Sequence, residues 1–286
     1  MFATRQLLTA TTVLLLATTA GARNPVVVQL TDGKNAGPSG DNQGPGAEQS
    51  DIIHSVIGGH HYLTTVWMSS QVQAQGDANY QCKCATVEMD PLTGPRVVVP
   101  PTQITTNNGG GDRPCNHPRM ALNDLTGQIL WSYGSDDGNG NNVQPYVQGM
   151  DAMCNLTTNR LRIGNNNGND GAVHVQTINP AAGLFMVGYL ENNQRARAVG
   201  ISLPEGATTL ASNTTDNNNH PLGGNILYNK NIIDPANIGR PSIATFDSGH
   251  AILCSSNGNN RPPEIGVACA MVDAQNGSKT WTTGEA

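Results

Sequence analysis

Charged residues are scarce in this chain, and basic residues are scarcer than acidic ones. Only 13% of the 286 residues are charged, and the formal net charge is −6. Nucleic-acid-binding proteins need a basic patch that neutralises phosphates, and polybasic segments are what anionic membrane surfaces attract. Both kinds of partner are therefore disfavoured. Helix signals are equally sparse, because after residue 22 no stretch of a dozen residues keeps apolar side chains at positions i, i+3 and i+4.

The single long apolar run lies at the N-terminus. Arg5 precedes the run from Leu7 to Thr18, and Ala20-Gly21-Ala22 supplies the small residues of a cleavage site. This order is typical of a secretory signal peptide, and the run is shorter than the roughly 20 apolar residues of a membrane helix. We therefore expect residues 1–22 to be a signal peptide, no membrane span, and a secreted or periplasmic/extracellular location.

In an exported protein, cysteines usually form disulfides. The six cysteines are Cys82, Cys84, Cys115, Cys154, Cys254 and Cys269. Sequence alone does not resolve their pairing, but Cys254 and Cys269 fall on successive apolar runs of one repeat and are the pair that we expect. The segment Cys82-Lys83-Cys84 lacks the two-residue spacer of a redox or zinc motif, which indicates a structural role.

From His54 onward, four segments share one order of apolar runs, tight turns and loops rich in Asn and Gly. The repeats span about 54–105, 113–165, 170–212 and 238–286, and Gly127, Gly183 and Gly249 end equivalent turns. Their spacing suits four short strands with their turns. Residues 23–53 are expected to be a flexible entry segment with one strand at Val26–Leu30, because Gly, Asn, Pro and Gln dominate the rest.

This pattern predicts an all-β protein, a β-propeller built from four-stranded antiparallel blades. About four blades are visible, fewer than most closed propellers hold. The chain is accordingly expected to be a fragment of a larger propeller, or to contain blades that the pattern does not reveal.

Two segments resemble known propeller motifs. Residues 121–131 (ALNDLTGQILW) resemble the tryptophan motif of quinoprotein repeats, A-x-D-x-x-T-G-x-x-x-W, with Asn123 at the Asp position and one residue fewer before Gly127. Residues 272–281 (VDAQNGSKTW) resemble that motif and, loosely, an Asp box. The repeats are thus similar to the propeller group that includes Asp-box sialidases and quinoprotein-like proteins. The resemblance implies a fold in which Trp131 and Trp281 lock neighbouring blades together.

One Asn/Asp loop has the spacing of a calcium loop. Asp137, Asn139 and Asn141 place oxygen ligands at alternating positions, which is the pattern that Ca²⁺ uses. The loop offers few carboxylates, so a plain β-turn remains the alternative.

Arginines and histidines near the first strand of each repeat are the candidate ligand-binding residues. They are Arg113, Arg119, Arg240, His117 and His250. First strands line the channel of a propeller, so these side chains are expected to converge at its mouth, where guanidinium groups bind carboxylates in bidentate fashion. The alternative is that they cap strand ends or pair with acids. Together with His54, His60, His61 and His174, the two histidines would form a ring of inward side chains that binds a metal ion. The alternative is that these histidines fill space in the protein and are hydrogen-bonded.

No recognisable catalytic set emerges, and three functions stay open. The first is a secreted, non-catalytic propeller that binds an extracellular glycan or protein partner. The second is a sialidase-like glycoside hydrolase or lyase that acts at the channel mouth, which would need two suitably spaced carboxylates. The third is a structural surface protein without a polar pocket.

Overall fold

The computed structural model describes residues 13–15, 26–28, 47–72, 78–105, 115–135, 143–164, 171–192, 195–234, 241–257 and 266–282. Over these residues the protein is all-β, apart from the single 3-10 turn η1 (Pro180–Ala182). Four sheets have four antiparallel strands each, which confirms the predicted fold class. No helix in this part of the chain is long and apolar enough to cross a membrane.

Each four-stranded sheet is called a blade. Blade 1 holds β3 (Ala47–Ile57), β4 (His60–Val72), β5 (Ala78–Asp90) and β6 (Gly94–Gln103). Blade 2 holds β7 (Asn116–Leu122), β8 (Ile129–Ser135), β9 (Gln144–Met150) and β10 (Leu161–Arg162), and blade 3 holds β11 (Gly171–Asn179), β12 (Leu184–Glu191), β13 (Arg195–Ser202) and β16 (Ile226–Ile233). Blade 4 holds β17 (Ser242–Asp247), β18 (His250–Asn257), β19 (Gly266–Asp273) and β20 (Lys279–Thr282). Two small pairs are β1 (Val13–Leu15) with β2 (Val26–Val28), and β14 (Thr214–Thr215) with β15 (Pro221–Leu222).

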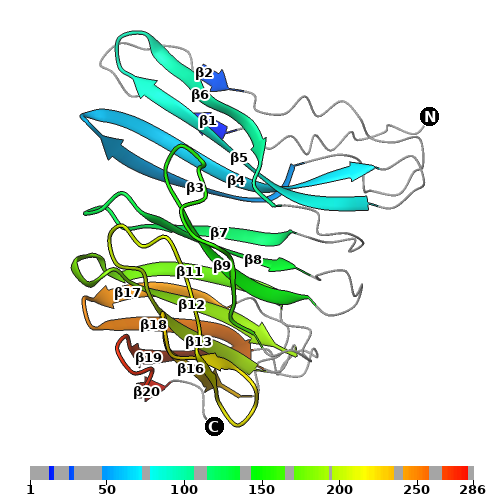
Figure 1. Cartoon of the computed structure of the whole chain (residues 1–286), viewed down its shortest axis with the longest axis vertical. Helices are drawn as coiled ribbons and strands as arrows, with labels where there is room; N and C mark the ends of the chain where they lie inside the picture. The colour runs from blue at the N-terminus through cyan, green and yellow to red at the C-terminus, as the bar shows by residue number, and fades with distance from the viewer. Residues whose placement is uncertain are drawn as a thin grey trace.

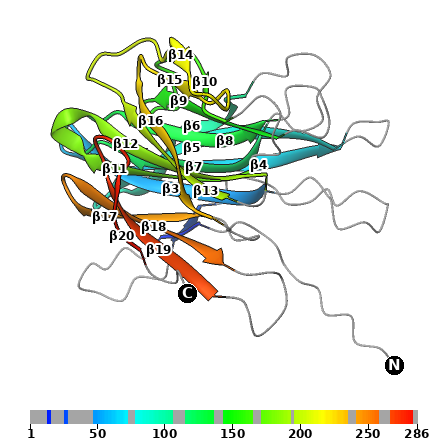
Figure 2. The ribbon, with the colours of Figure 1, turned by 90° about the horizontal axis from the view of Figure 1, so that it is seen from below.

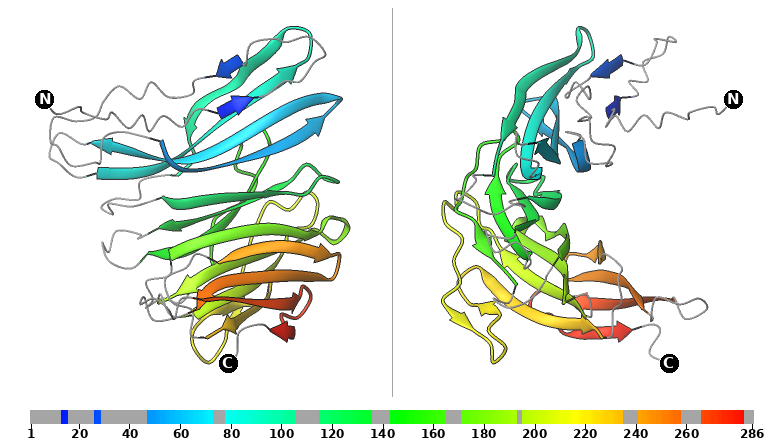
Figure 3. Two further views of the ribbon diagram at one scale, coloured as in Figure 1. Left: turned by 180° about the vertical axis from the view of Figure 1, so that it is seen from behind. Right: turned by 90° about the vertical axis from the view of Figure 1, so that its right-hand side faces the viewer.

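The blades follow one another in chain order along an open arc (Figures 1 and 3). The first strand of each blade lies beside the first strand of the next, so β3, β7, β11 and β17 form the inner edge of the arc. Both end blades carry large apolar side chains that are exposed. Ile52 and Val56 of blade 1 are 44% and 56% exposed, and Phe246 and Val267 of blade 4 are 62% and 68% exposed.

Two predicted boundaries differ from the structure. Blade 1 begins at Ala47, inside the segment predicted to be a flexible entry, because β3 pairs with β4 from Ala47 to Ile57. Blade 3 extends to Ile233 instead of ending at residue 212. Its fourth strand, β16, follows an excursion that contains β14 and β15, and this insertion hid the strand from the repeat pattern. At the N-terminus, β1 lies within the predicted signal peptide and pairs with β2.

Apolar clusters fill the space between successive blades. Met68 of blade 1 and Met150 of blade 2 share one cluster, with the fully buried Trp131 between the same two blades. A second cluster joins blades 2 and 3, and a third joins blades 3 and 4. Trp131 therefore occupies the blade-locking position that the motif resemblance implied. Trp281 is 50% exposed and does not.

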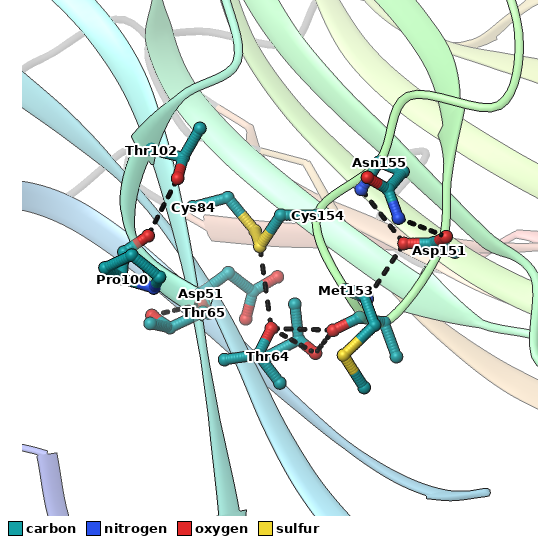
Figure 4. Close-up of a disulfide and its surroundings, with 12 residues drawn as sticks. Asp51, Thr64, Thr65, Cys84, Pro100, Thr102, Asp151, Met153, Cys154 and Asn155 are labelled. Carbon is teal, nitrogen blue, oxygen red and sulfur yellow. Dashed lines mark hydrogen bonds between the residues drawn. A yellow bond between two sulfur atoms is a disulfide. The ribbon is translucent and has the colours of Figure 1, made fainter. Parts of the chain in front are cut away.

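Disulfides fasten blade 1 to blade 2. Cys82 pairs with Cys115, and Cys84 pairs with Cys154 in the loop after β9. Figure 4 shows the second disulfide beside Thr64, whose hydroxyl donates to the carbonyl of Ala152 at 2.9 Å. The third disulfide, Cys254–Cys269, joins β18 to β19 as predicted. Three disulfides indicate folding in an oxidising compartment.

Candidate functional site

Polar side chains form hydrogen bonds between each inner strand and the next one. Asp51 Oδ2 on β3 accepts the Met120 amide of β7 at 2.8 Å, and His174 Nδ1 on β11 accepts the Ile243 amide of β17 at 3.1 Å. The Thr177 hydroxyl donates to the Leu122 carbonyl at 2.7 Å. Because inner strands do not pair through a continuous backbone ladder, these side chains satisfy backbone groups that would otherwise lose their partners.

Asp51, Arg119 and His174 come from three consecutive inner strands, and the charges of Arg119 and Asp51 both act on the His174 ring; we call these three residues the inner-edge cluster. Arg119 is half-buried, and its Nη1 donates to the Pro118 carbonyl at 3.0 Å and to the Ser50 carbonyl at 3.3 Å. The Asp51 carboxylate accepts the Ile52 amide through Oδ1 at 2.9 Å and the Met120 amide through Oδ2. The cluster thus draws one side chain from each of three consecutive blades.

The neighbours of His174 keep its ring neutral. Burial lowers the pKa of His174, the positive charge of Arg119 lowers it further, and the negative charge of Asp51 opposes both. An Nδ1 that accepts a backbone N–H carries no proton, which assigns the proton to Nε2. His174 therefore offers an Nε2–H donor.

Among the predicted ligand-binding residues that the structure describes, Arg119 is the one that lies in the inner-edge cluster. His117 lies two residues away, at a register shift in β7 with φ of 50°, a backbone state uncommon outside glycine. His250 begins β18, just after the turn that follows β17, and its Nδ1 contacts Asp247 at 3.0 Å. Arg113 and Arg240 lie outside the described residues.

The described residues do not form a metal site. Asp137, Asn139 and Asn141 lie outside the described residues, so the predicted calcium loop stays a prediction. Within the described ranges, no group of three or more His, Cys, Asp or Glu side chains is arranged to hold a metal ion. His54 and His61 contact each other, with 2.9 Å between Nε2 and Nδ1, while His60 contacts Glu88. The histidines therefore do not form a ring around a common centre.

Carboxylates along the described inner edge are few. Asp51 lies in the cluster, whereas Asp247 lies at the opposite end of β17 and accepts the Gly249 amide at 2.7 Å. That hydrogen bond and the contact with His250 lower the pKa of Asp247, so it is ionised at neutral pH. Glycoside hydrolysis uses two carboxyl groups about 5–10 Å apart, and among the described side chains of the four inner strands only Asp51, on blade 1, and Asp247, on blade 4, are carboxylates.

Sequence reasoning missed Asp51 and a second charged cluster. Asp51 follows a Gly- and Asn-rich stretch and falls within the predicted entry segment; its position on the same strand face as Ile53 and Ser55 is the available signal. The second cluster joins Glu191, Arg197, Asp216 and His220 at the outer side of blade 3. Its members come from three separate elements, and no local motif connects them.

No protein-family model matches the chain, and no curated protein is similar to it in sequence. Solved structures do resemble it. A glycosyl hydrolase from Bacteroides ovatus shares 10% identity at a TM-score of 0.47, over 83% of this chain and 70% of its own. An endo-arabinase from Bacteroides thetaiotaomicron shares 11% at 0.45, over 83% and 82%. An exo-β-1,3-galactanase from Phanerochaete chrysosporium shares 12% at 0.45, over 83% and 49%.

The names of these three proteins describe glycoside hydrolases. This is the class of the second hypothesis, and not of the non-catalytic binder. At such low identity and TM-score, the likeness leaves the activity of this chain to be argued from its own residues.

Proposed function

We propose that this protein is secreted and binds an extracellular glycan at the inner edge of its arc, through Arg119 and His174. The observations that support the proposal are the hydrogen bonds that hold Asp51 and Arg119 across β3 and β7, and the charge effect of both residues on His174 of β11. A guanidinium group presents planar donors that suit carboxylate or paired hydroxyl oxygens. The neutral His174 ring adds a single N–H donor, so the cluster favours a ligand rich in acceptor oxygens.

Glycoside hydrolysis is the second candidate, and one observation favours it. Asp51 places a carboxylate at the level where a bound sugar would contact Arg119. However, both Asp51 oxygens accept backbone amides, and a second carboxylate is required for the reaction. Binding without cleavage is accordingly the preferred function.

The test is a glycan array probed with the mature chain, followed by mass spectrometry of the same glycans after incubation. Retained and intact glycans would support binding. Shortened glycans would instead establish hydrolysis, and Asp51→Asn would then abolish the cleavage while Asp247→Asn, at the far end of β17, would leave it unchanged. If no glycan is retained on the array and none is shortened, the proposal is contradicted and a structural surface protein is favoured.

A further inference from the structure

Successive blades are joined in one repeating way. We call the side of a blade that looks toward blade 4 along the arc its forward face, and the opposite side its backward face. Met68 on the forward face of blade 1 shares a cluster with Met150 on the backward face of blade 2. In the same way, Met186 on the forward face of blade 3 shares a cluster with Leu253 on the backward face of blade 4. Each joint therefore pairs a forward face with a backward face.

The forward face of blade 4 is apolar and exposed. Side chains alternate between the two sides of a strand, so Ile252 points away from Leu253, which is buried against blade 3. Ile252 pairs with Met271 and Met271 pairs with Trp281, so all three side chains lie on the forward face. On the same face, Val267 is 68% exposed and Trp281 is 50% exposed. Figure 2 views the molecule from this end of the arc.

The backward face of blade 1 is apolar and exposed along its innermost strand, β3. Ile53 packs against the cluster that blade 1 shares with blade 2. Ile52 and Val56 point to the opposite side by alternation, and both remain exposed. The small strand β2 lies near β6, at the outer margin of the blade. Figure 3 shows that blades 1 and 4 form the two ends of the arc.

The centres of both faces suit contact with another apolar surface. On the forward face, the disulfide Cys254–Cys269 lies next to the pair of Ile252 and Met271. On the backward face, His54 pairs with Leu63 between the positions of Ile52 and Val56. Among the described side chains, these centres hold no carboxylate, lysine or arginine. Contact between the two faces would therefore bury no ion without a partner, which is a large cost in association.

The two exposed faces are the two halves of the joint that already connects the blades within the chain. A second copy of this chain brings the complementary half, because its blade 1 presents a backward face to blade 4 of the first copy. Contiguous exposed apolar surface is typical of an interaction site. A two-fold contact between two forward faces would be a kind of joint that the described blades do not use.

We propose that copies of this chain associate head to tail, with the forward face of blade 4 bound to the backward face of blade 1 of a second copy. Within the chain, the first strands of successive blades lie side by side, so this joint places β3 of the second copy beside β17. The two faces in contact differ, so the assembly either closes into a ring or grows in one direction. The inference does not depend on glycan binding, because Asp51, Arg119 and His174 lie outside the two exposed faces.

Sedimentation velocity of the mature protein at about 1–100 μM tests the association. We expect the wild type to reach the mass of two or more chains as its concentration rises. Val56→Asp and Val267→Asp each place a carboxylate on one of the two faces, at side chains that are 56% and 68% exposed. Each variant alone should sediment as a single chain, with a dissociation constant raised at least about hundredfold. A wild type that stays a single chain at every concentration would overturn the proposal.

Mixing the two variants tests the direction of the joint. Val56→Asp keeps an intact forward face, and Val267→Asp keeps an intact backward face. The mixture should therefore form a complex of two chains and no larger species, because the remaining face of each chain is blocked. If either variant associates with itself, like faces meet and the head-to-tail joint is wrong. If the mixture stays as single chains, a second copy does not cover these faces and a different protein becomes the expected occupant.

A matched control separates the end faces from exposed apolar residues in general. Leu125 is 69% exposed in the turn between β7 and β8 of blade 2, so Leu125→Asp should associate like the wild type. Loss of association in this control would contradict the assignment to the end faces. Circular dichroism checks that each variant folds, and Ile52→Asp or Trp281→Asp replaces a variant of the same face that does not.

Discussion

The inner-edge cluster and the outer cluster of blade 3 are built from the same residue types, but their histidines have different hydrogen-bond partners. Each contains a carboxylate, an arginine and a histidine. At the inner edge, His174 accepts a backbone amide and its pKa is lowered. At the outer side, His220 lies between two carboxylates, with Nδ1 3.0 Å from Asp216 and Nε2 hydrogen-bonded to Glu191.

The difference shows that the partners of the two ring nitrogens decide the role of a histidine, more than the residue types nearby. The outer cluster is closed, because Arg197 and His220 direct their donors at Glu191, Asp216 and Asn229. The inner cluster still has donor capacity on Arg119 and on Nε2 of His174, which makes it the better candidate for a ligand.

The largest expected loss of stability follows removal of a disulfide that joins blades 1 and 2. Removing Cys84–Cys154 with the double substitution to Ala should lower the free energy of unfolding by about 4 kcal/mol, because this disulfide closes a long loop and joins blades 1 and 2. Denaturant unfolding measures the loss. The matched control is removal of Cys254–Cys269, which closes a shorter loop inside blade 4 and should cost about 3 kcal/mol. A larger loss in the control would contradict this ranking.

The outer cluster should be the next most sensitive. Glu191→Gln should lower the free energy of unfolding at neutral pH by about 3 kcal/mol, since it leaves the buried Arg197 guanidinium without its carboxylate partner. The pKa of Glu191 is lowered in the folded state, so its contribution is present above the ordinary carboxyl range and is lost as the pH falls through the lowered value. The difference between variant and wild type should therefore shrink in acid. Asp234→Asn, at an exposed pair, should cost less than about 0.5 kcal/mol.

A smaller loss is expected at the inner edge. Asp51→Ala should lower the free energy of unfolding by about 1–2 kcal/mol, because the Met120 amide loses its acceptor. Asp51→Asn retains one acceptor oxygen and should lose about half as much, which denaturant unfolding resolves. Equal losses in the two variants would show that charge, and not the hydrogen bond, is what Asp51 contributes.

The smallest effect is a pair of opposite changes in the pKa of His174. Arg119→Gln should raise this pKa and Asp51→Asn should lower it, since each removes one charge acting on the ring. Proton NMR titration of the ring measures both. Because the folded pKa is lowered, the His174 contribution to stability should decrease as the pH falls below about 6.5, where the unfolded chain binds the proton first. Shifts of the His174 pKa in the same direction in both variants would show that Arg119 and Asp51 do not act on this ring with opposite charge effects.

The sequence predicted much of the fold and little of the site. Glycine turns and alternating apolar runs marked most strands, and the spacing of Cys254 and Cys269 marked a cross-strand pair, because all of these are local signals. β16 was missed because the insertion that contains β14 and β15 separates it from β13. Glu191, His220 and Asp51 were missed because their partners lie far away in the chain, and only the fold brings them together.

The inner-edge site is tested most directly by the affinity for any glycan that the array retains, measured for the wild type, Arg119→Ala and Arg96→Ala. Arg96 lies on β6 and pairs with Glu88 at 2.5 Å, away from the inner strands. We expect Arg119→Ala to bind at least about tenfold more weakly and Arg96→Ala to bind like the wild type. Equal affinity of all three proteins would contradict glycan binding at the inner edge.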